Sequence, residues 1–99
     1  MPRVIELSEA ALADFDNIYD SISKHNPRAA AKTLRALDAA IQHLPDQPHM
    51  GRAYQHGRHR LRLLTHRDYP VFYRERPGVI ELVRTPHGMQ NIPDILDEI

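Results

Sequence analysis

Strand-like alternation in the second half of the chain constrains the fold most strongly. Between Gly51 and Asn91, three short runs with the length of β-strands are separated by turn signals. The predicted strands are 58–65, 69–74 and 79–84. The last run is apolar on both faces, which is typical of a central strand, whereas Pro70 confines the middle run to a strand start or a sheet edge.

The first half predicts one strand and two helices. Residues 3–7 alternate as a short strand, and Ser8 is an N-cap for an amphipathic helix that ends near His25. Asn26-Pro27 is a tight link, because Asn caps helices and Pro is favoured in the first turn. The second helix is predicted over 27–44, where apolar residues recur at helical spacing: Ala30, Leu34, Leu37, Ile41 and Leu44. The two helices are expected to form an antiparallel hairpin.

Three segments carry weaker signals. The acids of the first helix (Asp14, Asp16 and Asp20) fall mostly off its apolar stripe and are predicted to be solvated. Residues 45–57 contain several Pro and Gly and are predicted to be a loop. The tail beyond Pro93 is long enough for one or two helical turns, docked either on its own body or on a partner. We therefore expect one α+β domain over residues 1–99, a helical hairpin packed on a mainly antiparallel sheet (β-α-α-β-β-β), with a short C-terminal tail or helix.

Arginines dominate the charge of the predicted sheet. The stretch from Gly51 to Arg67 holds five arginines and no acid, although the whole chain has no net charge. Period two places Arg58, Arg60 and Arg62 on one outer face, with Leu61 and Leu63 facing inward. Like charges at this spacing repel, so an acidic partner would stabilise them. The alternative is a set of solvated side chains that splay apart.

Several classes of function find no support in the sequence. Cysteine is absent, and no apolar run approaches the roughly 18 residues of a membrane span, so a cytoplasmic protein is expected. The N-terminus lacks the apolar core of a signal peptide. His56, His59 and His66 do not form a recognisable metal motif, and no phosphate-binding loop or nucleophile elbow is present. We therefore expect no metal and no cofactor.

Acid–base cleavage of RNA is the one enzymatic hypothesis that the residue types allow. It needs a base, an acid and cations for the developing charge. Arg60, Arg62, Arg84, Tyr73 and His87 carry suitable groups. Tyr73 is better explained as a core or edge aromatic, while for His87 a catalytic and a structural role are equally well supported.

At this point the sequence resembles the RelE/ParE toxin superfamily, and ParE most closely. The resemblance spans nearly the whole chain and rests on four motifs: N-P-R-A-A before the apolar ladder, P-H-M-G-R at 48–52, H-R-L-R-L followed by Y-P-V-F-Y-R at 69–74, and V-I-E-L-V-R-T-P-H-G-M-Q-N-I-P-D-I-L at 79–96. It implies the toxin of a type II toxin–antitoxin pair. An antitoxin would neutralise it by wrapping a segment over the helices and sheet. ParE relatives act on DNA gyrase, and RelE relatives cleave mRNA in the ribosome.

Departures from the RelE pattern favour the ParE function. Pro70 stands where RelE nucleases usually carry Arg, Gly88 follows His87 where a Tyr is often found, and lysines are absent from the second half. Gln90-Asn91 replaces the Arg-Asp that is common in ParE relatives, which leaves open a weakened toxicity or a different target.

The leading hypothesis is therefore a non-enzymatic inhibitor whose partners are a cognate antitoxin and DNA gyrase, without sequence-specific nucleic acid binding. The residues predicted to bind partners are Arg58, Arg60, Arg62, Arg84, His87, Gln90 and Asn91. One alternative is a ribosome-dependent mRNA interferase that uses His87, Arg60 and Arg84. Another is a non-toxic module that only binds the antitoxin.

Overall fold

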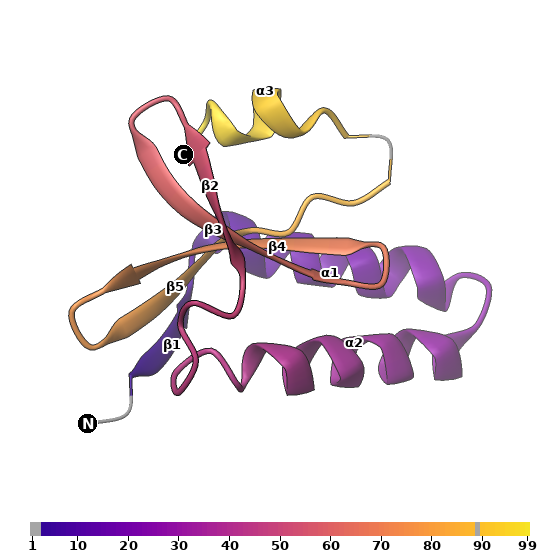
Figure 1. The fold of residues 1–99 in the computed structure, drawn as a ribbon. Helices are drawn as coiled ribbons and strands as arrows, with labels where there is room; N and C mark the ends of the chain where they lie inside the picture. Colours follow the sequence, from indigo (N-terminus) through magenta and orange to yellow (C-terminus); the bar gives the residue numbers. More distant parts are fainter. Residues whose placement is uncertain (1–2, 89) are drawn as a thin grey trace.

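The computed structural model describes residues 3–88 and 90–99 and is an α+β arrangement of three layers. Figure 1 shows a twisted sheet between a helical hairpin and a short C-terminal helix. The elements in chain order are β1 Val4–Leu7, α1 Glu9–Ser23, α2 Pro27–Ile41, β2 Arg52–His56, β3 His59–His66, β4 Tyr69–Arg76, β5 Val79–Arg84 and α3 Ile92–Leu96. The predicted fold class is confirmed.

Local capping sets the helix starts where the sequence predicted them. The Ser8 hydroxyl accepts a hydrogen bond from the Ala11 amide and donates one to the Val83 carbonyl, which ties the start of α1 to β5. The Asn26 side chain accepts from the Ala29 amide, and Pro27 occupies the first turn of α2. Helix α2 is shorter than predicted and ends at Ile41, but a tight turn still buries Leu44 completely.

The sheet has the strand order β1-β5-β4-β3-β2. Strand β1 runs parallel to β5, and the other three pairings are antiparallel. The helical hairpin connects β1 to the rest of the sheet, so the first and last strands of the chain lie side by side (Figure 1). This order leaves β1 and β2 as the two edges.

Strand β2 corrects the prediction that residues 45–57 are a loop. It forms a hairpin with β3, closed by Gly57 and Arg58, with Gly57 at a φ of 57°. The favoured two-residue hairpin turns need a positive φ at their first residue, and glycine adopts that conformation without strain. The sequence R-A-Y-Q-H gave no strand signal because only Tyr54 is a large apolar residue. Its strand conformation comes from pairing with β3.

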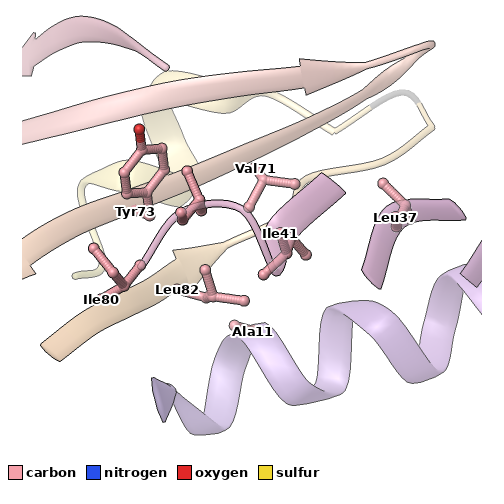
Figure 2. Close-up of a cluster of buried hydrophobic side chains, with 8 residues drawn as sticks. Ala11, Leu37, Ile41, Val71, Tyr73, Ile80 and Leu82 are labelled. Atoms are coloured by element: carbon pink, nitrogen blue, oxygen red, sulfur yellow. The ribbon is translucent and has the colours of Figure 1, made fainter. Parts of the chain in front are cut away.

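Two separate cores cover the two faces of the sheet. On the hairpin side, buried residues of β4 and β5 meet α1 and α2, as Figure 2 shows for Val71, Tyr73, Ile80, Leu82, Ala11, Leu37 and Ile41. On the other face Phe72, Val83 and Leu61 pack against Leu96 of α3. The tail therefore docks on its own body, which resolves the alternative that the sequence left open.

Among residues 3–88 and 90–99, no helix combines the length and apolar character needed to cross a bilayer.

Candidate functional site

An apolar groove lies between β1 and the helical hairpin. It is a cavity of about 300 Å³ whose walls include Ile5, Phe15, Leu34 and Ile41. Among the described residues, four of the five exposed large hydrophobic side chains belong to β1 (Val4 and Leu7) and α1 (Leu12 and Tyr19), two of the elements that line the groove. Apolar surface gathered beside a free strand edge is typical of a protein-binding site.

A second depression, the arginine cleft, opens where the sheet extends beyond the helices. It measures about 450 Å³, and the residues lining it are His49, Ala53, Tyr54, Gln55, Arg60, Leu61, Arg62, Arg74 and Glu75. Cross-strand pairing joins Ala53 to Arg62 and Gln55 to Arg60, and directly paired residues project on the same face. The cleft lining has more basic than acidic side chains and includes a small residue, Ala53.

The predicted row of three arginines on one outer face is partly wrong. Arg58 lies in the β2–β3 turn, outside the strand. Arg60 and Arg62 do share a face, but it is the face that carries the helices, because Arg62 pairs with Tyr73 of the hairpin-side core. Leu61 and Leu63 point to the other face and pack under α3.

Arg84 is engaged in a nearly buried ion pair. Its Nε and one terminal nitrogen donate to the two carboxylate oxygens of Asp14, at 2.8 and 2.9 Å, and the Thr85 amide donates to the same carboxylate at 2.8 Å. The hydrogen bond to Asp14 raises the pKa of Arg84 above its usual range, against an opposing effect of burial. The prediction of a solvated Asp14 is wrong, since this residue is only 2% exposed.

A sequence signal for this ion pair was present. Ala11, Asp14 and Ile18 recur at helical spacing, so Asp14 lies within the buried stripe of α1. An acid in such a stripe requires a partner. The sequence does not show which arginine is this partner, because Arg84 lies 70 positions from Asp14.

The predicted residues after β5 have local roles in the structure. The Gln90 side chain accepts a hydrogen bond from the His87 amide, and the Asn91 side chain caps α3 by accepting from the Asp94 amide. His87 lines a small cavity with Ile18 and other residues of α1. Its Nδ1 is buried and has no hydrogen-bond partner among the described residues. These contacts brace the segment that leads into α3.

The three residues of the interferase hypothesis lie apart. Arg60 lines the arginine cleft, Arg84 lines a depression next to the C-terminus, and His87 lines the cavity beside α1. Acid–base catalysis requires these groups to surround the same atoms of the substrate, and residues in three separate depressions do not meet that requirement.

Tyr73 is a core residue, as the sequence favoured. It is fully buried, donates to the Pro48 carbonyl at 2.7 Å and accepts from the Gly51 amide at 2.9 Å. Burial raises the pKa of its hydroxyl. It therefore anchors the loop between α2 and β2.

His56, which the sequence analysis considered as a metal ligand, makes an ion pair in the structure. His56 pairs with Asp97 at 2.7 Å and so links the end of β2 to the C-terminal segment. Within the part of the chain that the structure describes, no three His, Asp or Glu side chains lie close enough to hold a metal ion.

Fold and sequence together define the class of this protein. Residues 5–92 match the model of the ParE toxin of the type II toxin–antitoxin system parDE. The match covers most of the chain, so the protein belongs to the ParE toxin family, and the resemblance found in the sequence is confirmed.

A solved structure supports the fold. The chain is similar to a protein described as the chromosomal ParDE TA system from P. aeruginosa, with a TM-score of 0.72 and 21% sequence identity. The similarity covers 88% of this chain and 96% of the other. No curated protein shows a significant match to the sequence.

Proposed function

We propose that this ParE family toxin inhibits DNA gyrase in the cytoplasm and is neutralised by a cognate antitoxin. The observation that carries the proposal is the family match over residues 5–92, which includes the hairpin, strands β2 to β5 and all of β1 except Val4. Binding rather than catalysis is favoured because Arg60, Arg84 and His87 line separate depressions.

The apolar groove is the proposed contact surface for the antitoxin. An extended segment can pair with the free backbone groups of β1, because within the described residues β1 has a strand neighbour only on its β5 side. Apolar side chains of the same segment would enter the groove next to Phe15 and Leu34. Burial of this apolar surface would drive association.

The test of the target is a gyrase supercoiling assay with the purified chain. The expected result is inhibition, or accumulation of cleaved DNA, that increases with toxin concentration and is reversed by the protein encoded next to it. Unchanged supercoiling at large excess would contradict gyrase as the target. Cleavage of ribosome-bound mRNA that His87→Ala abolishes would favour the interferase instead. Harmless overexpression with tight antitoxin binding would indicate the non-toxic module.

The test of the groove is Leu7→Glu, which places a charge in its wall. Leu7 is 43% exposed, so the fold should tolerate the change while antitoxin binding weakens at least tenfold. Met50→Glu is the matched control, because Met50 is 40% exposed and does not line the groove. Equal loss of binding in both variants, measured by calorimetry, would contradict this location.

A further inference from the structure

We propose that the arginine cleft binds a carboxylate on an acidic segment of a protein partner, and that Arg60 and Arg62 are the residues that hold it. This inference rests on the proposed function only in that the partner is a protein. It differs from the predicted patch of three arginines, because Arg58 lies in the turn and does not line the cleft.

The cleft contains cationic groups with unused hydrogen-bond donors. No hydrogen bond or ion pair joins the Arg60 guanidinium to another described residue. Arg62 donates one hydrogen bond, from a terminal nitrogen to the Gly51 carbonyl at 2.9 Å. A guanidinium has five N–H donors in a planar fork that fits a carboxylate. Arg62 is therefore oriented by the Gly51 carbonyl and keeps donors for a ligand.

The acid that lines the cleft, Glu75, already has partners of its own. Glu75 contacts a terminal nitrogen of Arg3 at 2.7 Å and His49 Nε2 at 3.4 Å. Arg74, which also lines the cleft, makes two hydrogen bonds through Nε and one through a terminal nitrogen to Glu81. These pairs leave Arg60 and Arg62 as the uncompensated charges.

The position and the size of the cleft suit a peptide side chain. Ala53 pairs directly with Arg62 and has no side chain beyond Cβ, so it adds little side-chain bulk beside Arg62. Strand β2 is an edge of the sheet, and a partner segment can approach from there. A cavity of about 450 Å³ lies within the range of ligand sites, roughly 300–1,000 Å³. It suits one or two side chains of a peptide.

Charge favours an acidic peptide over nucleic acid. Nucleic acid binding gains affinity by neutralising several phosphates along a basic surface. The chain has no net charge, and the cleft lining includes one acid, Glu75, beside its arginines, so it is not the extended basic surface that a row of phosphates needs. Two arginines in a small cleft match a single carboxylate better than a phosphate backbone.

The test is an NMR titration of the full chain with a tetraglutamate peptide whose ends are blocked. The expected result is a set of amide shifts centred on Ala53, Arg60 and Arg62. A tetraglutamine peptide should leave these resonances unchanged. Arg60→Gln should weaken tetraglutamate binding about fivefold, the upper limit for an exposed ion pair. This variant should fold, because no hydrogen bond or ion pair joins the Arg60 side chain to another described residue.

Arg58→Gln is the matched control and should bind the peptide like the original chain. Arg62→Lys keeps the charge but loses the planar fork, and should weaken binding less than Arg62→Gln. Absence of localised shifts, or equal losses in Arg58→Gln and Arg60→Gln, would overturn the proposal. Tighter binding of inorganic phosphate or of a short DNA strand at the same residues would also overturn it. Because no gyrase enters this titration, its outcome is separate from that of the supercoiling assay.

Discussion

Replacement of Asp14 by alanine is expected to destabilise the domain by about 3–5 kcal/mol. The carboxylate accepts two hydrogen bonds from Arg84 and one from the Thr85 amide, in a site where the Asp14 side chain is 3% and the Arg84 side chain 11% exposed. Its loss leaves a nearly buried cation whose one remaining acidic neighbour among the described residues is Glu98, at 3.8 Å. The cost arises from the unpaired cation and the unpaired amide, so it exceeds the value of a surface ion pair.

The size of this loss can be measured with a graded series of variants. Asp14→Asn keeps one carbonyl oxygen for the arginine or the amide and should cost about 2 kcal/mol, so it stays folded even if alanine does not. In the double variant Asp14→Ala with Arg84→Met, the unpaired cation is gone. The double variant should therefore lose at least about 2 kcal/mol less than the sum of the single changes.

Urea denaturation followed by circular dichroism is the appropriate assay. A loss of about 3 kcal/mol lowers the midpoint by roughly 1–3 M urea at the slopes typical of small domains. Asp16→Ala, on the exposed side of the same helix, is the control and should change stability by less than about 0.5 kcal/mol. A loss below about 1 kcal/mol for Asp14→Ala, or additive single and double variants, would refute the argument that this pair holds α1 to β5.

Three further predictions concern other parts of the fold. Gly51→Ala should lower the free energy of unfolding by about 1–3 kcal/mol in urea denaturation. The new Cβ would lie 2.7 Å from the Tyr73 hydroxyl oxygen and 2.9 Å from a backbone carbon of β3, so a neutral result would mean that the loop shifts freely. Leu96→Ala should cost about 2–5 kcal/mol, since this residue is fully buried under the sheet, and hydrogen exchange should then increase in α3; unchanged protection would show that α3 does not depend on this contact. The hydrogen bond from Arg74 holds the pKa of Glu81 below its ordinary value of 4.5, so the unfolded chain binds this proton more readily. The resulting stability is present above about pH 4.5 and is lost as the pH falls through the lower pKa that Glu81 has in the folded chain. Glu81→Gln should reduce stability at neutral pH and make the loss of stability in acid smaller. An unchanged dependence of stability on pH would contradict this role of Glu81.

The candidate site was only partly visible in the sequence. The arginine-rich stretch drew attention to β3, but the strand register decided that Arg60 and Arg62 line a cleft while Arg58 lies in a turn. The apolar groove was not predicted, because it forms where β1, α1 and α2 meet and none of these segments shows it alone. Gln90 and Asn91 were noted as departures from the family pattern, and the structure gives both of them local hydrogen bonds.

The sequence alone determined the elements whose causes are local. Ser8 and Asn26 cap the two helices through hydrogen bonds to amides three residues away, and the 27–44 ladder sets the buried face of α2 from its own spacing. The tertiary structure decided what depends on distant partners. Strand β2 exists because β3 supplies its hydrogen bonds, and Asp14 is buried because Arg84, 70 positions away, compensates its charge. Caps and periodicity act within a few residues, whereas burial and pairing depend on which segments the folded chain brings together.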